Sequence, residues 1–158
     1  MKQKTNVMRM LDAAKIPYRV MEYEVDESNL AGTHIAEQIG LAYEVVFKTL
    51  VARGDKTGPV VFCIPCDREI DLKKAARVTG NKRIEMVQVK ELPLLTGYIR
   101  GGCSPIGMKK KFPTYIDETA IICDEITVSA GVRGAQLLLS AEMLIAFTDA
   151  KPVDLTMS

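Results

Sequence analysis

Histidine and tryptophan are almost missing from this chain of 158 residues, which has one histidine, His34, and no tryptophan. Hydrolysis by a nucleophile paired with a histidine base therefore has little support, since His34 lies far along the chain from the other candidate residues. The chain also lacks a Gly-x-Ser-x-Gly elbow, a Walker loop and a motif of paired carboxylates. An enzyme with this sequence would depend mainly on positioning and on backbone electrostatics.

Long apolar runs and an excess of charge are missing as well. No stretch approaches the ~20 apolar residues of a membrane-spanning helix, and the lysine-containing N-terminus does not resemble a secretory signal. We therefore expect a cytoplasmic protein with no membrane partner. The formal net charge is +1, from 21 basic and 20 acidic residues. We expect no DNA partner, and any RNA contact must depend on local basic patches.

The length and the hydrophobic content of 47% predict a single domain over residues 1–158 with a packed core. Apolar periodicity alternates between helical and extended spacing, and strands outnumber helices, which favours an α/β fold of the α+β type, a mixed or antiparallel sheet with flanking helices. Helices are predicted from the cap Asn6 to Pro17, from Thr33 to Gly40, from the cap Asp71 to Gly80, and from the cap Ser140 to Phe147. Strands are predicted near residues 21–25, 43–53, 60–64, 84–86, 114–116, 120–122, 126–129 and 135–139, with a short helical or irregular stretch at 89–95.

Lys48 stands out because it lies within the apolar segment 45–51. By strand alternation it shares a face with Val46 and Leu50. A lysine there must reach water, find a partner or line a cavity. The alternative interpretation is a lysine on an edge strand whose ammonium group extends to water, and the pattern alone does not decide between them.

Two glycine-rich segments could bind a ligand. Residues 100–107 contain Gly101 and Gly102, whose N–H groups could hold a phosphate or stabilise an oxyanion. Residues 128–134 end a predicted strand, and Ser129 there could orient a substrate amine or carbonyl. Each segment could equally be a tight surface turn.

The four cysteines are expected to be thiols, and two of them form a Cys-x-x-Cys pair. Cys63 and Cys66 follow a predicted strand and precede a helix, which is the context of a dithiol redox motif. Against this, Cys66 lies several residues before the helix cap Asp71, where a helix N-terminus would lower a thiol pKa less. A zinc site is disfavoured, because one such pair with two scattered cysteines and His34 lacks suitable spacing.

Basic residues cluster in two places. Lys109–Lys111 follow the first glycine-rich segment, while Lys73, Lys74 and Arg77 lie on a predicted helix that is followed by Lys82 and Arg83. Charge runs are usually solvated faces. The basic triplet beside a glycine loop could instead bind phosphates at the end of an RNA.

Taken in order, six elements resemble the YbaK/EbsC family of free-standing aminoacyl-tRNA deacylases. They are residues 16–18 leading to Tyr23, then 47–50, 72–76, 96–98, 101–107 with the lysines that follow, and 128–134. The resemblance spans nearly the whole chain. It implies a mixed, largely antiparallel, barrel-like sheet with flanking helices, and no cofactor.

The resemblance also implies an activity and a set of site residues. Members of the family remove wrongly attached amino acids from tRNA, and the YbaK branch acts on Cys-tRNA(Pro). Lys48 would bind the terminal phosphate or ribose of the acceptor end, and Gly101 and Gly102 would hold the scissile carbonyl. The implied substrate-binding residues are Tyr23, Thr49, Ser104, Pro105, Ser129 and Gly131.

The chemistry implied by the resemblance is substrate-assisted: the cysteinyl thiol attacks its own ester and leaves as a thiolactone, so that no protein base is needed. Because the net charge predicts weak binding of tRNA alone, prolyl-tRNA synthetase is an expected partner. Residues 63–69 depart from the small polar residues of the family, which leaves the amino-acid preference open. Two alternatives stand beside this interpretation. One is a catalytically silent relative that only binds tRNA or a synthetase, and the other is an oxidoreductase using Cys63 and Cys66.

Overall fold

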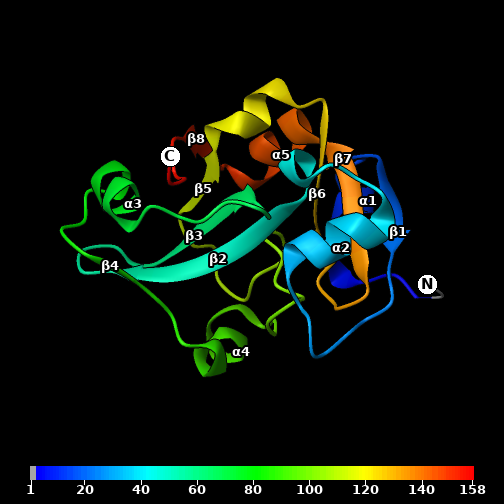
Figure 1. The fold of residues 1–158 in the computed structure, drawn as a ribbon, viewed down its shortest axis with the longest axis horizontal. Helices are drawn as coiled ribbons and strands as arrows, with labels where there is room; N and C mark the ends of the chain where they lie inside the picture. Colours follow the sequence, from blue (N-terminus) through cyan, green and yellow to red (C-terminus); the bar gives the residue numbers. More distant parts are fainter. Residues whose placement is uncertain (1–2) are drawn as a thin grey trace.

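The computed structural model describes residues 3–158, and in this range eight strands form two sheets (Figure 1). The smaller sheet is antiparallel, with the order β1-β7-β6. The larger sheet has the order β4-β2-β3-β5-β8, in which β2 pairs antiparallel with β3 and β4, while β5 pairs parallel with β3 and β8. The strands are β1 Tyr18–Glu22, β2 Phe47–Gly54, β3 Gly58–Pro65, β4 Ile84–Met86, β5 Thr114–Asp117, β6 Glu125–Ser129, β7 Ala135–Ser140 and β8 Lys151–Val153.

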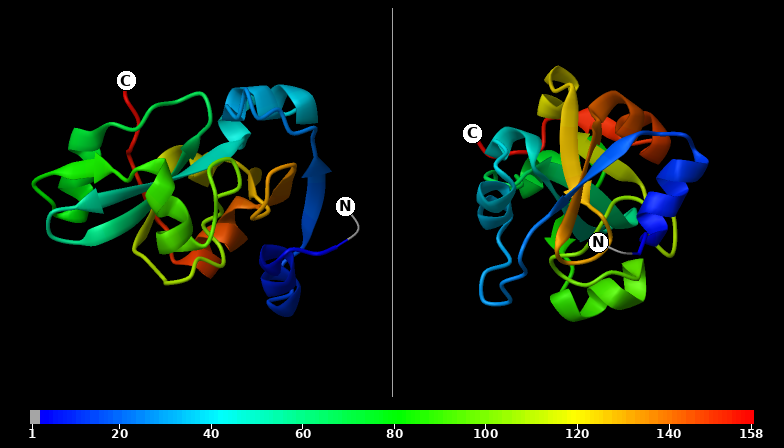
Figure 2. Two further views of the ribbon diagram at one scale, coloured as in Figure 1. Left: turned by 90° about the horizontal axis from the view of Figure 1, so that it is seen from below. Right: turned by 90° about the vertical axis from the view of Figure 1, so that its right-hand side faces the viewer.

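This arrangement confirms the predicted mixed α/β architecture, although the strands form two open sheets and no closed barrel within the described residues. The three-stranded sheet lies at one end of the molecule, and β4 with α3 lies at the other (Figures 1 and 2). An isolated parallel bridge between Val46 and Thr127 connects the start of β2 to β6. The two sheets therefore meet at the N-terminal end of β2.

The helices surround the sheets, and two of the predicted caps are confirmed. The Asp71 carboxylate accepts hydrogen bonds from the backbone N–H groups of Lys73 and Lys74, and Ser140 accepts from that of Met143. The predicted cap Asn6 is wrong, because the Thr5 hydroxyl is the acceptor at the start of α1. The α-helices are α1 Asn6–Ala13, α2 Gly32–Ile39, α3 Leu72–Thr79, α4 Leu92–Thr96 and α5 Ala141–Thr148, with 3-10 turns at Tyr43–Val45, Val89–Glu91 and Glu118–Ile122.

The strand predicted at residues 120–122 is wrong, because a 3-10 turn occupies this segment. The carboxylate of the buried Asp117 accepts from both the N–H and the hydroxyl of Thr119, which caps the turn. The strand predicted at 21–25 begins earlier, at Tyr18, because the register with β7 places Tyr18 opposite Leu139. The start of β1 depends on a long-range partner that a local pattern does not reveal, whereas the cap of the 3-10 turn is a local contact.

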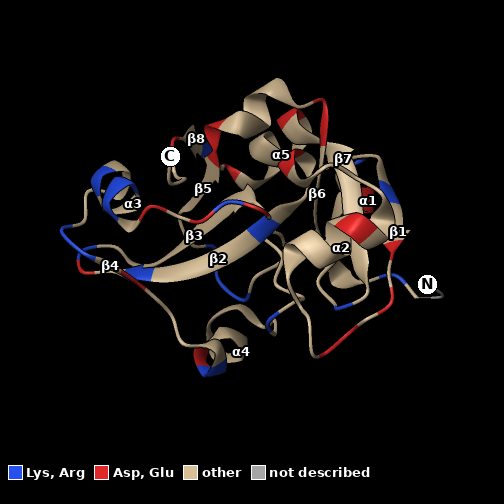
Figure 3. Cartoon of the chain, viewed as in Figure 1, with Lys and Arg blue, Asp and Glu red and all other residues tan. Residues whose placement is uncertain are grey.

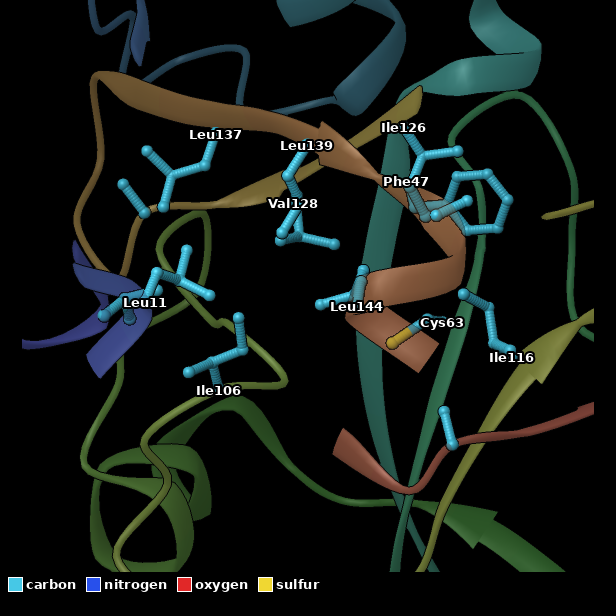
Figure 4. Close-up of a cluster of buried hydrophobic side chains, with 14 of the residues drawn as sticks. Leu11, Phe47, Cys63, Ile106, Ile116, Ile126, Val128, Leu137, Leu139 and Leu144 are labelled. Carbon is cyan, nitrogen blue, oxygen red and sulfur yellow. The ribbon is translucent and has the colours of Figure 1, made fainter. Parts of the chain in front are cut away.

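The main core lies between the two sheets (Figure 4). Side chains from both sheets converge there with Leu11 of α1 and Leu144 of α5, each at most 1% exposed. A second cluster, which includes Phe62 and Ala75, lies between the larger sheet and α3. Ala52 of β2 belongs to this second cluster and Leu50 packs against it, so the even-numbered side chains of β2 face away from the main core. Within residues 3–158, no helix has the length and apolar character that crossing a bilayer requires.

Replacing a leucine of the main core should destabilise the protein strongly. Leu137 is fully buried, so Leu137→Ala should lower the free energy of unfolding by about 2–5 kcal/mol in urea denaturation. Leu94→Ala is the matched control, because Leu94 is 79% exposed and its loss should change stability by less than about 0.5 kcal/mol. Equal effects of the two substitutions would contradict this description of the core.

Candidate functional site

A cavity of about 340 Å³ opens where the two sheets meet, at the N-terminal end of β2. Four segments wall it: the start of α2, the first residues of β2, the glycine-rich loop and the smaller sheet. Its lining includes two cations and no histidine or carboxylate side chain from residues 3–158. The lining residues are Leu30, Ala31, Gly32, Ile35, Val46, Phe47, Lys48, Thr49, Leu50, Cys66, Arg100, Gly101, Cys103, Ser129 and Gln136.

Lys48 lies on the wall of this cavity, which is one of the outcomes predicted from its apolar surroundings. It is partly buried and pairs with Ile64 in the β2–β3 ladder. On the same face of β2, the preceding residue Val46 belongs to one apolar cluster and the following residue Leu50 packs against another, so Lys48 lies between the two clusters. Its ammonium has no ion-pair or hydrogen-bond partner among residues 3–158, so an anionic ligand would be its counter-charge.

The glycine-rich loop is held against the turn that follows β6. The Arg133 side chain donates from Nε to the carbonyl oxygen of Arg100 at 2.8 Å. Gly102 is buried so tightly that a Cβ there would lie 3.1 Å from the backbone of Val132. Gly101 has a φ of 86°, which favours glycine. Side chains at either glycine would therefore push the loop off its support.

The two glycine amides differ in availability. The Gly102 N–H donates to the carbonyl oxygen of Ile99 at 3.0 Å, and Gly102 does not line the cavity. The N–H groups of Gly101 and Cys103, which do line it, have no acceptor within the described part of the chain. Gly101 and Cys103 thus combine a place in the cavity lining with an unpaired backbone N–H.

The smaller sheet contributes two polar side chains, one of which the sequence reasoning missed. Ser129 accepts a hydrogen bond from the Gly131 N–H at 3.1 Å, which leaves its hydroxyl proton free to donate. Gln136 is 5% exposed, and its Oε1 accepts from the Thr127 hydroxyl at 3.1 Å. Its NH₂ group has no acceptor among residues 3–158, and Gln136 is one of the residues that line the cavity. A lone glutamine inside the apolar segment 135–139 was the signal that could have revealed it.

Other predicted residues lie outside the cavity. Ser104 is fully buried and accepts from the Ile106 N–H, and Pro105 lines a separate cavity with Lys110 and Lys111. Gly131 forms the turn beyond β6. The structure therefore gives these residues, and the basic triplet, no place on the wall beside Lys48.

Tyr23 lies in a small cleft that adjoins the cavity. The cleft and the cavity share Leu30, Ile35 and Gly101 as lining residues. His34 lines this cleft and not the cavity. Thr49, in contrast, lines the cavity itself, with its hydroxyl 3.9 Å from the Cys63 sulfur. The structure thus brings Lys48, Thr49, Gly101 and Ser129 together, with Tyr23 at the edge.

The two cysteines of the Cys-x-x-Cys pair lie in different clusters. Cys63 packs in the main core, and burial raises the pKa of its thiol to about 12. Cys66 packs with Ala36 and Val46, and burial raises the pKa of its thiol to about 11. Redox cysteines need the opposite shift, so the dithiol oxidoreductase alternative loses its basis. No group of three or more potential ligands from His, Cys, Asp or Glu gathers anywhere in residues 3–158 to hold a metal ion.

Gly32, at the start of α2, touches Cys66 across the cavity wall. A Cβ on Gly32 would lie 2.6 Å from the Cys66 Cβ, a distance that real side chains do not reach. The helix therefore approaches the turn after β3 this closely only because residue 32 is glycine.

Residues 32–147 match the aminoacyl-tRNA editing domain family. The chain belongs to this family. A relative from Enterococcus faecalis, "Putative Cys-tRNA(Pro)/Cys-tRNA(Cys) deacylase EbsC", is 49% identical over 98% of this chain and 94% of its own length. Family membership confirms the expected enzyme class, an aminoacyl-tRNA deacylase.

Solved structures share the fold. The chain matches the "Crystal structure of a putative trans-editing enzyme for prolyl tRNA synthetase" with a TM-score of 0.82 and 25% identity, over 99% of this chain and 100% of that one. A hypothetical protein that is 20% identical matches with a TM-score of 0.87, over 97% of this chain and 100% of that one. At this identity, the second match shows the fold alone.

The raised thiol pKa values predict slow alkylation in the native protein. At pH 8 a thiol with a pKa of about 11, such as Cys66, is thiolate about 0.1% of the time. Iodoacetamide should therefore modify Cys63 and Cys66 at least tenfold more slowly in native than in urea-unfolded protein, as followed by mass spectrometry. Rapid native loss of both thiols under mild oxidation would restore the redox alternative.

Proposed function

We propose that this enzyme removes cysteine from Cys-tRNA(Pro), and that the substrate supplies the nucleophile. The observation that carries the proposal is the composition of the cavity wall, which offers Lys48 and Arg100 as cations and no histidine or carboxylate as a base among the described residues. Such a cavity attracts the anionic end of an RNA. It has no group suited to activate water, so the reaction needs a nucleophile of its own.

Six of the lining residues have proposed roles that their contacts support. Lys48, which has no counter-charge in residues 3–158, binds the terminal phosphate of the acceptor end. The Gly101 N–H, with that of Cys103, donates to the oxygen of the scissile carbonyl, where negative charge develops. Ser129 and Gln136 orient the α-amino group and the side chain of the bound amino acid, and Thr49 shapes the floor. This assigns the oxyanion contact to Gly101 and a packing role to Gly102.

The proposed step is an intramolecular acyl transfer. The cysteinyl thiolate attacks its own ester carbon, a carbon–sulfur bond forms, and negative charge passes to the carbonyl oxygen. Collapse of this intermediate breaks the ester bond, and the ribose oxygen leaves and takes up a proton. Holding the sulfur against the carbonyl is the main task of the protein. The name of the Enterococcus faecalis relative supports the choice of cysteine.

Prolyl-tRNA synthetase is the partner that we propose for delivery of the substrate. That enzyme cannot fully reject cysteine, because a pocket discriminates similar small side chains by only about 1–3 kcal/mol. The structural match to a protein described as a trans-editing enzyme for this synthetase supports the pairing.

Replacing Lys48 should abolish editing without unfolding the chain. We expect Lys48→Ala to lower kcat/KM for release of labelled cysteine from Cys-tRNA(Pro) by about 100-fold or more, because the terminal phosphate then has no ammonium group to bind. Lys151→Ala, at an exposed lysine of β8, is the control and should keep full activity. Correctly charged Pro-tRNA(Pro) should persist with every variant. Full activity of Lys48→Ala would remove the central assignment.

Blocking the substrate thiol should stop the reaction. Cys-tRNA(Pro) alkylated on sulfur should resist the enzyme, and Ala-tRNA(Pro) should do so as well. The rate with native Cys-tRNA(Pro) should rise with pH towards the thiol pKa of about 8.5, because the thiolate is the nucleophile. Cleavage of the alkylated substrate at the native rate would show that water is the nucleophile.

A further inference from the structure

The near-neutral net charge conceals a strong asymmetry along the chain. Residues 48–111 contain 14 lysines and arginines against 6 aspartates and glutamates, whereas the rest of the chain contains 7 against 14. In Figure 3 the blue of this middle segment gathers on α3, on the chain that leads to β4 and at the adjoining end of β2. One end of the molecule is therefore basic.

A groove of about 690 Å³ runs through this basic end. Strands β2 and β4, together with the turns at their ends, form its walls. Its cationic lining residues are Arg53, Arg83 and Lys90, and Lys82 precedes Arg83 in the same turn. The groove is open to solvent, since all four of these side chains are exposed.

Two of the carboxylates in the groove are already engaged within the fold. Asp55 accepts from the backbone N–H groups of Lys82 and Arg83, which lowers the pKa of its carboxyl group. Glu91 accepts from the Gln88 N–H and pairs with Arg53 at 3.0 Å, and its pKa is lowered as well. These acids hold the turns in place, and neither carboxylate forms an ion pair with the side chain of Lys82, Arg83 or Lys90.

The remaining cations have no internal counter-charge. Among residues 3–158, no carboxylate lies within ion-pair distance of Lys82, Arg83 or Lys90. The same holds for three exposed cations nearby in the fold: Lys56, which follows the lining residue Asp55, and Lys73 and Arg77 on α3, the helix that contacts β4. Together these cations outnumber the carboxylates of the lining, of which Glu85 is the third. A row of unpaired cations beside a groove matches the chemistry of a phosphate backbone.

The groove and the catalytic cavity lie on one strand. Lys48 lines the cavity, and Arg53 lines the groove five residues further along β2, on the opposite face of the strand. Thr49, which also lines the cavity, shares the face of Arg53, and at the rise of an extended strand these two residues are about 13 Å apart, the reach of a few nucleotides. An RNA whose 3′ end enters the cavity could therefore place its next phosphates at the groove.

We propose that this groove, defined by Arg53, Lys82, Arg83 and Lys90, binds the phosphate backbone of the tRNA acceptor arm. This inference rests on the proposed function, since it takes the RNA at Lys48 as its starting point. The contact is independent of sequence, because no base-reading geometry is involved. It accounts for how a chain of net charge +1 engages a polyanion.

Charge reversal in the groove tests the proposal. We expect Lys82→Glu, Arg83→Glu and Lys90→Glu together to weaken binding of uncharged tRNA(Pro), measured by fluorescence anisotropy at low salt, by about tenfold or more. The plot of log affinity against log salt concentration should flatten by about one unit for each phosphate that the variant no longer binds. Substitution of the same three residues by glutamine removes their charge without reversing it and should weaken binding less than glutamate does. Unfolding midpoints equal to that of wild type would show that neither variant binds weakly because it is misfolded.

A minimal substrate separates this proposal from the proposed function. Cysteine esterified to a CCA trinucleotide should be cleaved equally by wild type and the triple variant, whereas Cys-tRNA(Pro) should be cleaved more slowly by the variant. If wild type cleaves neither substrate, the editing assignment fails, while the binding assay still decides the groove.

The control for net charge is a second triple variant, Lys15→Glu with Arg19→Glu and Lys151→Glu, at exposed positions outside the groove. It changes the net charge equally and should bind tRNA nearly as wild type does. Equal decreases in affinity for the control and the groove variant would overturn the proposal in favour of a general charge effect. A groove variant that keeps wild-type tRNA affinity and salt dependence, but loses editing only when the synthetase is present, would overturn it in favour of a protein-binding surface.

Discussion

Strand β2 is part of the larger sheet and is also bridged at its start to the smaller sheet, and the position of the site depends on this double attachment. Its odd-numbered side chains, such as Phe47 and Val51, pack into the core between the sheets. Its even-numbered side chains face clusters under α2 and α3, with Lys48 at the interval between them. At its start, the bridge from Val46 to Thr127 ties it to the smaller sheet. A strand fixed on both faces and at its end cannot shift register, because a slip of one residue would exchange every side chain between the faces. Lys48 is therefore held beside the cavity by the packing of its neighbours.

The remaining groups of the site are placed by contacts between backbone segments. Arg133 bonds the carbonyl of Arg100, and Gly102 lies directly against the turn at Val132, so the loop and the turn form one unit. Such an arrangement suits a reaction in which charge develops on a carbonyl oxygen, because fixed N–H groups need no reorganisation when the charge appears. It also fits a cavity wall without acidic side chains or histidine in residues 3–158. In the proposed reaction the protein has to hold the substrate in the reactive geometry, and the junction of the two sheets provides a rigid support for doing so.

Much of this could be predicted from local signals. The apolar runs at residues 43–53 and 60–64 predicted strands where β2 and β3 lie, and Asp71 with the glycine at 80 predicted α3. The apolar surroundings of Lys48 predicted that its ammonium group must reach water, a partner or a cavity. Local signals failed where distant partners decide. The parallel pairing of β8 with β5 is one example, because the three residues of β8 carry no pattern that predicts it. The 3-10 turn at residues 118–122 is a different case, since Asp117 caps it from a position two residues before Thr119 and this local signal was missed. The separation of Ser104 and Pro105 from Gly101 was also hidden, because adjacent loop residues can point to opposite sides. Gln136 was visible as a polar residue in an apolar strand, but only the Thr127 contact shows its orientation.

The contact between Gly32 and Cys66 has an implication for how the cavity can change. A side chain added at residue 32 collides with the Cβ of residue 66, so α2 cannot stay in place unless the partner shrinks. The two positions are about thirty residues apart in sequence, and random mutagenesis would sample compatible pairs rarely. Selection for a different amino-acid preference would therefore find single substitutions elsewhere on the wall first. Residues 32 and 66 are therefore sterically coupled, and a redesign of this part of the cavity wall has to change both positions together.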